Sequence, residues 1–257
     1  MTKPLIMGVL NITPDSFSDG GLYNTPDLAY EQAAELVRDG ADILDVGGES
    51  TRPGAARVPI AEEMARVVPV IERISKLGAA VSIDTMNAET ARAAVAAGAI
   101  IINDVSGGLN DPEIFEVAAE TNTTLIISHW RGHSDKMDEL TEYQDVAKDV
   151  ASELQIQVAL AKSAGVHKIV IDPGLGFAKN VDQNWELLEN LHELEKIRLP
   201  ILIGASRKRF IAARLQGDDT VEARDAATAK LMQDLTSKHN LWGIRVHNVK
   251  AVSARQN

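Results

Sequence analysis

Eight short apolar runs, each as long as one buried β-strand and each followed by a helix-length segment, constrain the fold of this chain most strongly. Continuous apolar runs of this length are typical of parallel strands that are covered on both faces. Alternating strands and helices predict parallel strands joined by crossover helices. Eight such units within 257 residues favour an α/β fold, a single-domain (β/α)8 TIM barrel, over an open doubly wound sheet. We expect the strands at Leu5–Leu10, Ala41–Val46, Ala80–Ile83, Ile100–Ile102, Thr124–Ile127, Lys168–Ile171, Ile201–Ile203 and Gly243–Val246.

Helices are expected between these strands, where apolar residues recur at helical spacing. Met64, Val67 and Ile71 show this spacing, and glycines such as Gly78 mark helix ends. No linker-like segment interrupts the pattern, so residues 1–257 are interpreted as one domain. The expected helices are Pro26–Asp39, Ala61–Leu77, one from Asn87 or Ala88 to Ala97, Pro112–Glu120, Glu142–Ala164, Asn184–Lys196, one that runs to about His239 with a break near Gln216–Asp219, and a short one from Val249.

The overall composition excludes several classes of function. The chain contains no cysteine, which excludes disulfides, zinc–thiolate sites and a cysteine nucleophile and fits the cytosol. Its formal net charge of −11 disfavours general nucleic-acid binding, so an anionic substrate would need a local cluster of positive charge. The amino end lacks a secretory pattern, and no apolar run approaches the ~18 residues of a membrane span. We therefore expect a cytoplasmic protein with small-molecule substrates and with neither nucleic acid nor membrane among its partners.

Small polar or charged residues stand at the ends of nearly all the expected strands. In a (β/α)8 barrel the carboxyl ends of the strands share one rim, where active sites are built. Such a residue can also simply cap the helix that follows, and for one residue alone capping is the better interpretation. A set on nearly every strand favours a shared site. The set comprises Asn11, Asp45, Asp84, Asn103, His129, Asp172 and His247.

Three of these residues suit recognition of a flat, nitrogen-rich ring. A carboxylate such as Asp84 or Asp172 accepts two hydrogen bonds from a planar pair of donors, and Asn103 offers both a donor and an acceptor. A hard metal ion would need clustered carboxylates, whereas these are spread around the rim and mixed with an amide. The structural alternative for Asp84 is a turn or a cap before the next helix.

Basic residues follow the last two strands, at the usual phosphate position of such barrels. The run 206–209, Ser-Arg-Lys-Arg, comes after Gly204 and Ala205, which allow close approach of the backbone. The same run opens a helix whose N-terminus favours anions. Arg245 and His247 share one facing of the eighth strand. An isolated basic run is more often a solvated turn, but this combination predicts an anion site.

With these motifs in order along almost the whole chain, the sequence resembles the dihydropteroate synthase family. The matching segments are MGVLNITPDSFSDGG, DVGGESTRPGA, SIDT, IINDVSGG, SHWR, IDPGLGFAKN, GASRKRF and IRVHNV, of which NITPDSFSDGG and GGESTRPGA are the most specific. The details of SHWR, GLGFAK and SRKRF are similar to actinobacterial members. The resemblance implies a barrel, usually a homodimer, that condenses 6-hydroxymethyl-7,8-dihydropterin pyrophosphate with p-aminobenzoate in folate biosynthesis and is the target of sulfonamides.

The resemblance also implies roles for individual residues of this sequence. Asn11 would be a ligand of a Mg2+ ion that also holds pyrophosphate, and Arg245 and His247 would bind the pyrophosphate itself. The implied pterin-binding residues are Asp84, Asn103, Asp172 and Lys208. Two loops that close over the second substrate carry Asp15, Phe17, Asp19, Thr51, Arg52 and Pro53, and its wall is formed by Phe177 and Lys208. The residues expected to act in catalysis are Asp19, Arg52, Lys208, Arg245 and His247.

Three positions depart from the family pattern. Ser128 stands where the family usually has a Met packed on the pterin face, and a smaller, polar residue loosens that contact. Arg209 replaces a small hydroxyl that meets the benzoate carboxylate; it either contacts that carboxylate or points to solvent and leaves the contact to backbone N–H groups. Asn248 replaces an Asp, which loses a charge near the phosphates but keeps a helix cap.

The alternative function is that of a binding protein, either a catalytically silent pterin-binding paralogue or a pterin-binding barrel of the methyltransferase type. Ser128 and Asn248 are the residues that favour it. Such barrels share the pterin pocket but have no need of the anion site after the last two strands or of NITPDSFSDGG. Because the sequence contains both, we expect the enzyme.

Overall fold

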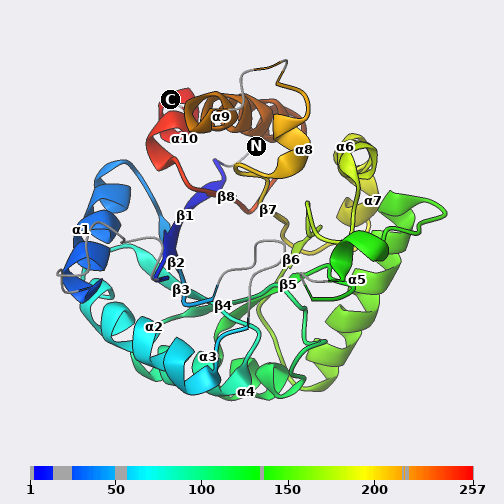
Figure 1. Cartoon of the computed structure of the whole chain (residues 1–257). Coiled ribbons are helices and arrows are strands. Elements are labelled where there is room, and N and C mark those ends of the chain that lie inside the picture. Colours follow the sequence, from blue (N-terminus) through cyan, green and yellow to red (C-terminus); the bar gives the residue numbers. More distant parts are fainter. Residues whose placement is uncertain are drawn as a thin grey trace.

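Eight parallel strands surround a common axis, and helices cover their outer side (Figure 1). The strands are β1 (Leu5–Asn11), β2 (Ile43–Gly47), β3 (Ala80–Asp84), β4 (Ile101–Asp104), β5 (Thr124–Ser128), β6 (Ile169–Asp172), β7 (Leu202–Ile203) and β8 (Gly243–Val246). This computed structural model describes residues 3–13, 25–49, 57–133, 136–215, 217 and 220–256. The strands pair in the order β6-β5-β4-β3-β2-β1-β8-β7. A bridge between Ile171 and Ile201 joins β6 to the start of β7, so the barrel is nearly closed.

The helices follow the strands along the chain, with α10 after the last one, and form a ring around the barrel (Figure 1). In the described part of the chain, no helix is long and apolar enough to cross a membrane. The helices are α1 (Thr25–Arg38), α2 (Ile60–Ile74), α3 (Ala88–Ala96), α4 (Glu113–Thr121), the 3-10 turn η2 (Met137–Glu139), α5 (Val146–Ser163), α6 (Val181–Glu189), α7 (His192–Glu195), α8 (Arg209–Ala212), α9 (Val221–Lys238) and α10 (Val249–Gln256).

The inward-facing residues of the strands form an apolar layer below a polar one. Side chains alternate along a strand, so residues two apart share the same facing. The outward-facing residues pack with the helices in the main core, whereas the inner apolar residues form a separate small cluster. In four strands, the residue two positions after an inner apolar residue is polar. It also faces the inside of the barrel, but it lies nearer the carboxyl end of the strand. Such pairs are Ile43 and Asp45, Ile101 and Asn103, Ile126 and Ser128, and Val170 and Asp172.

The predicted barrel is confirmed, and each of the eight predicted strands is present. Several strands extend past the predicted end because the polar residue that follows the apolar run still belongs to the ladder. Asp84 pairs with Asn103, and Ser128 pairs with Asp172. The candidate residues at these positions are therefore held by strand hydrogen bonding rather than by loops.

The predicted helix Asn184–Lys196 is wrong at both ends. Asn180 and Gln183 form a capping box, in which each side chain accepts the other residue's backbone N–H at 2.9 Å, and α6 therefore begins at Val181. The α6 helix ends at Glu189, and the four-residue helix α7 follows it as a separate element. The residues at the start of α6 follow a polar loop and show no helical spacing of apolar residues, so the predicted start of the helix is three residues late.

The long helix predicted from Glu142 begins later, at Val146. Asp145 caps it, because the Asp145 Oδ1 atom accepts the Lys148 N–H at 3.2 Å. The predicted break in the penultimate helical region is confirmed, since α8 and α9 are separate helices and Thr220 caps the second of them.

Candidate active site

Arg245 on β8 lies at the centre of a buried group of ion pairs inside the barrel mouth. Its Nε donates to Asp45 Oδ2 at 2.6 Å, and its Nη2 donates to Asp84 Oδ2 at 2.6 Å. Asn103 Nδ2 donates to the same Asp45 oxygen at 3.1 Å. We call these four residues, Asp45, Asp84, Asn103 and Arg245, the ion-pair cluster. The structure thus brings together three of the predicted site residues from β3, β4 and β8.

Burial and charge determine how the ion-pair cluster titrates. Burial raises the pKa of Asp84 to about 7, and Arg245 opposes this rise. Burial alone would lower the pKa of Arg245, but the carboxylates of Asp45 and Asp84 together raise it above its usual value. The cluster therefore holds a permanent cation beside a carboxyl group whose pKa is raised by burial.

Asp172, at the end of β6, lies close to the ion-pair cluster. Its Oδ1 accepts the Gly174 N–H at 2.6 Å. Its Oδ2 faces Gly204, where a Cβ atom would stand 3.4 Å from that oxygen and 3.8 Å from Arg245 Cβ. Burial raises the pKa of Asp172, and Lys208 is the main opposing charge. Glycine at position 204 therefore keeps open the space between the Asp172 carboxylate and Arg245.

Lys208, the residue before α8, packs on the loop that follows β6. Its Nζ donates to Leu175 O and lies 4.7 Å from the centroid of the Phe177 ring. Gly176 has φ +77°, and a Cβ there would approach Lys208 Cδ to 2.9 Å, so both the backbone and the packing need glycine. Burial lowers the pKa of Lys208 to about 8, although Asp172 opposes this shift. The predicted wall residues Phe177 and Lys208 are thus in contact.

The loop after β7 is tied to the end of β8. Ser206 Oγ accepts the backbone N–H of His247 at 3.1 Å and lies 3.0 Å from His247 Nδ1. Asn11 ends β1 on the neighbouring side, where a Cβ on Gly47 would stand 3.7 Å from Asn11 Oδ1 and 3.6 Å from Asp84 Cβ. Asn11 is therefore next to the ion-pair cluster, as expected for a residue of the same rim.

The other two basic residues of the run 206–209 point away from this mouth. Arg207 forms a two-pronged ion pair with Asp225 on α9, at 2.7 and 2.8 Å. Arg209 pairs with the exposed Asp138 at 2.9 Å, which matches the solvent-facing alternative for this residue. Asn248 donates to Asp225 Oδ2 at 3.0 Å and accepts the Ala251 N–H at 2.9 Å, so it keeps its expected capping role.

The capping interpretation holds for some strand ends but not for all. Asp104 accepts the N–H groups of Ser106 and Gly108, at 2.8 and 2.6 Å, and so stabilises a turn. Asp84 instead accepts from Arg245, and the N-terminus of α3 is served by Asp111, whose Oδ2 accepts the Ala88 N–H at 2.8 Å. The structural alternative for Asp84 is therefore wrong.

Sequence reasoning missed the central position of Asp45. The strand pattern predicts a strand-end residue at position 45 but assigns it no role. Within the described residues its Oδ2 joins Arg245 to Asn103, while no donor reaches its buried Oδ1. The signal that could have found it is the facing it shares with Ile43 inside the barrel. Ser128 is buried at the end of β5, as the alternation predicts.

Six predicted residues lie outside the described part of the chain. They are Asp15, Phe17, Asp19, Thr51, Arg52 and Pro53. The described residues on either side of the second of these segments are connected, because Arg57 Nε forms an ion pair with Glu49 Oε1 at 2.9 Å. The predicted roles of these six residues stay predictions.

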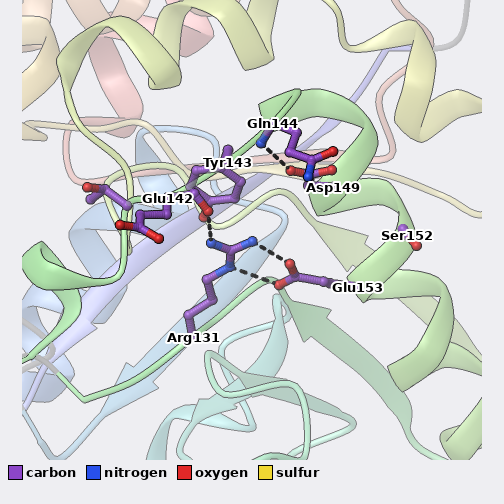
Figure 2. A pocket seen from close by; sticks show the side chains of 8 residues that line it. Arg131, Glu142, Tyr143, Gln144, Asp149, Ser152 and Glu153 are labelled. Carbon is purple, nitrogen blue, oxygen red and sulfur yellow. Dashed lines mark hydrogen bonds and ion pairs between the residues drawn. The ribbon is translucent and has the colours of Figure 1, made fainter.

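A separate open pocket of about 720 Å3 lies at the start of α5 and is lined by none of the predicted site residues (Figure 2). Arg131 is the side chain at its inner end. Its guanidinium donates to Glu142 O at 2.6 Å and to both carboxylate oxygens of Glu153, at 2.5 and 3.1 Å. It also stacks 3.8 Å over the Tyr143 ring. Arg131 and Glu153 thus pair with each other, and the side chains of Glu142 and Asp149 also line the pocket.

The oxygen ligands at the rim suit a Mg2+ ion that is held mainly by water and by substrate phosphates. Among the described residues, no three His, Cys, Asp or Glu side chains lie together in a group that could hold a metal ion. Mg2+ commonly keeps several waters and takes one or two protein oxygens together with substrate phosphates. The amide oxygen of Asn11, beside the ion-pair cluster, fits that requirement.

The fold and this rim define a (β/α)8 barrel with a charged, polar mouth, and a family model described as pterin binding enzyme matches residues 7–247. A dihydropteroate synthase of Mycobacterium leprae is 47% identical over 96% of this chain and 89% of the relative. The dihydropteroate synthase of Xanthomonas albilineans with 4-aminobenzoic acid superposes with a TM-score of 0.91 at 39% identity, over 99% of this chain and 91% of that chain. That of Yersinia pestis in a sulfonamide drug complex has a TM-score of 0.88 at 37% identity, over 99% and 92%. The chain belongs to the dihydropteroate synthase family of pterin-binding enzymes.

Proposed function

We propose that this chain is a transferase that condenses 6-hydroxymethyl-7,8-dihydropterin pyrophosphate with p-aminobenzoate to give 7,8-dihydropteroate and pyrophosphate in folate biosynthesis. The observation that carries the proposal is the ion-pair cluster next to Asp172 and Lys208 at the carboxyl ends of the strands. Relatives of this name, among them structures with 4-aminobenzoic acid and with 7,8-dihydropteroate, support it.

The pterin ring is bound by the carboxylates and the amide of the rim. Asp84 and Asp172 accept hydrogen bonds from the planar N–H groups of the ring edge, and Asn103 supplies a donor and an acceptor. Arg245 donates to Asp84, and Asp45 accepts from Asn103 and from Arg245, so these bonds hold Asp84 and Asn103 in place. The space beside Gly204 allows the ring to reach the Asp172 carboxylate. Lys208 completes the site from the opposite side.

The pyrophosphate of the first substrate lies toward Arg245, His247 and the N-terminus of the helical segment after β7. Arg245 stays charged through the neutral range, so it can stabilise the charge that develops on the leaving group. Asn11, together with phosphate oxygens and water, would hold Mg2+. The ion would supply further stabilisation of the leaving pyrophosphate.

The reaction follows from charge placement and needs no side-chain nucleophile. The bond between the pterin methylene and the pyrophosphate oxygen breaks first, and its electron pair leaves with pyrophosphate. The carboxylates of Asp84 and Asp172 stabilise the cationic pterin that remains. The amino nitrogen of p-aminobenzoate then forms the new C–N bond and loses a proton. Phe177 and Lys208 form the wall for this second substrate, and Asp19 and Arg52 act in the two loops that exclude water.

We further propose that the protein acts as a homodimer in the cytoplasm and that sulfonamides occupy the p-aminobenzoate position. The sulfonamide complex of the Yersinia pestis relative supports the last point. The helix cap of Asn248 and its hydrogen bond to Asp225 count against a silent paralogue, because the departure at this position leaves the local network complete.

The test is turnover by the purified chain. With Mg2+ and dihydropterin pyrophosphate, we expect pyrophosphate release that depends on added p-aminobenzoate, and formation of dihydropteroate in equal amount. Chelation with EDTA should abolish the release, and added Mg2+ should restore it. Binding of a phosphate-free pterin with no pyrophosphate release under any of these conditions would instead support the silent paralogue.

A further inference from the structure

The loop 173–179 between β6 and α6 is fastened by a buried lysine at its end. Lys179 is 7% exposed, although lysine is rarely buried. Its Nζ donates to Gly174 O and to Phe177 O, both at 3.1 Å, and lies 2.9 Å from His129 Nδ1. Burial lowers the pKa of Lys179, and the three acceptors around Nζ favour its charged form, because an ammonium group has three protons to donate. The lysine thus bonds two carbonyls of its own loop to the end of β5.

His129 is itself oriented from the other side. Because the Glu153 carboxylate can only accept, the ring proton is on Nε2, which donates to Glu153 Oε2 at 2.9 Å and leaves Nδ1 to accept from Lys179. Arg131 holds that carboxylate with two hydrogen bonds (Figure 2). Burial lowers the pKa of His129 to about 4, so the ring is neutral at physiological pH and keeps this tautomer. The chain Arg131–Glu153–His129–Lys179 runs from the open pocket to the loop.

Other side chains fix the remaining residues of the same loop. Lys208 bonds to Leu175 O, Asn184 Oδ1 accepts the Gly176 N–H at 2.6 Å, and Tyr143 OH donates to Ala178 O at 2.9 Å. Ala178 has φ +47°, an unfavourable conformation for a residue with a Cβ, so its carbonyl contact compensates a real cost. Each residue from 174 to 178 therefore has a main-chain atom held by a side chain. These contacts fix the main chain of the loop and therefore the position of the Phe177 ring.

We propose that Lys179 and His129 are positioning residues for the second substrate. They hold the carbonyls of Gly174 and Phe177 so that the Phe177 ring and the Lys208 stem form a fixed wall. This inference rests on the proposed function, in which that wall receives p-aminobenzoate. Neither residue touches the ion-pair cluster in the described structure, and both connect to Asp172 only through main-chain atoms, of His129 and Gly174. Their main effect therefore falls on the second substrate rather than on the pyrophosphate of the first.

A matched pair of substitutions at His129 separates the two bonds of the ring. Asparagine places its amide where Nδ1 stands, so His129→Asn keeps an acceptor for Lys179 and loses the bond to Glu153. Glutamine reaches the position of Nε2, so His129→Gln keeps the bond to Glu153 and loses the acceptor for Lys179. Lys179→Met removes the amino group and keeps the length of the stem. Leu154→Ala, a buried change on α5 next to Glu153, is the control for a loss of stability alone.

We expect the substitutions to raise the Michaelis constant of one substrate and to leave that of the other nearly unchanged. His129→Gln and Lys179→Met should raise KM for p-aminobenzoate about tenfold, and KM for dihydropterin pyrophosphate should change less than about twofold. His129→Asn should keep KM for p-aminobenzoate within about twofold of the unaltered protein, and Leu154→Ala should change neither KM. Equal changes in both constants, or equal effects of Asn and Gln at position 129, would overturn the inference.

Hydrogen exchange gives a second readout that does not depend on turnover. We expect faster exchange of the Gly176 and Phe177 amides in His129→Gln and Lys179→Met than in His129→Asn or Leu154→Ala. If the unaltered protein forms no dihydropteroate, the proposed function fails, and the exchange measurement still decides whether these residues hold the loop. Unchanged exchange in His129→Gln and Lys179→Met would show that they do not.

Discussion

The two sides of the barrel mouth are built by different kinds of contact. In the ion-pair cluster, side chains from four strands bond to one another, and Arg245 carries both carboxylate contacts. Around the loop 173–179, side chains bond to main-chain atoms instead. A side-chain ion pair can exchange partners when an anion arrives, whereas a loop held at successive residues keeps its shape. The first side therefore suits a substrate whose charge changes during the reaction, and the second suits a planar aromatic ring.

The largest expected effect is that of Arg245→Ala. This change removes an anion-binding group and leaves Asp45 and Asp84 facing each other without their cation. We expect kcat/KM to fall about a thousandfold, and calorimetry should show a greater loss of affinity for dihydropterin pyrophosphate than for a phosphate-free pterin. Arg245→Lys keeps the charge but lacks the guanidinium that bonds to two carboxylates, so its kcat/KM should lie between those of the unaltered protein and of Arg245→Ala. Equal losses for both ligands would contradict the anion role.

Asp84→Asn should have the next largest effect, and mainly on the ring. The amide keeps the shape of the side chain but offers Arg245 a neutral oxygen and the pterin edge one acceptor fewer. We expect kcat/KM to fall about a hundredfold while the free energy of unfolding changes by less than about 1 kcal/mol, because burial of the charged form is already unfavourable. Urea unfolding and steady-state kinetics measure the two quantities. A stability loss as large as that of a core truncation would make Asp84 a structural residue.

Lys208 joins the two sides of the mouth, and its titration tests which side needs its charge. Burial lowers its pKa to about 8, so the ammonium is present below that pH and is lost as the pH rises through it. We therefore expect kcat/KM to decline above pH 8, by about tenfold per unit at most. In Lys208→Arg the guanidinium remains charged, and the decline should disappear even if the activity at pH 7 is lower. An unchanged decline in that variant would assign it to another group.

The difference between the two sides also explains how much could be predicted from the sequence. The barrel and the shared facing of Asp84, Asn103, Asp172 and Arg245 follow from strand periodicity, which is a local property of the chain. Asp45 has the same signal, but a strand-end aspartate is as easily a cap, and only its contacts with Arg245 and Asn103 distinguish the two. A loop has no regular alternation of side chains, so periodicity does not predict which of its residues are buried.

Lys179 shows the limit most clearly. A lysine in a polar, glycine-rich loop looks solvated, and its burial results from backbone carbonyls and from His129, which is 50 residues away in the chain. The contacts of Asn248 are likewise invisible in the sequence, since they depend on α9 packing beside the end of β8. Long-range contacts to main-chain atoms and between distant polar side chains carry no pattern of residue types.

The smallest effect is expected at Asn248, which follows β8, contacts α9 and belongs to neither side of the mouth. Asn248→Asp restores the family residue, but here it would bring a second carboxylate to the position where Nδ2 now donates to Asp225 Oδ2 at 3.0 Å. Because Asp225 already pairs with Arg207, the added charge is only partly compensated, and we expect a loss of about 1 kcal/mol in the free energy of unfolding at pH 7. Activity should stay within about threefold, since neither residue belongs to the ion-pair cluster or the loop 173–179.

Protonation should relieve the repulsion at this position, because a carboxyl pair that shares one proton no longer carries two charges. The stability of Asn248→Asp relative to the unaltered protein should therefore improve as the pH falls from 7 to about 4, as measured by urea unfolding at each pH. Asn248→Ala is the control, because it loses the same hydrogen bond to Asp225 and adds no charge; since it also loses the cap on the Ala251 N–H, the two variants are compared by their pH dependence and not by their stability at pH 7. If Ala and Asp at position 248 have the same pH dependence, the cost comes from the lost hydrogen bond, and the network of Arg207, Asp225 and Asn248 accommodates a second carboxylate without repulsion.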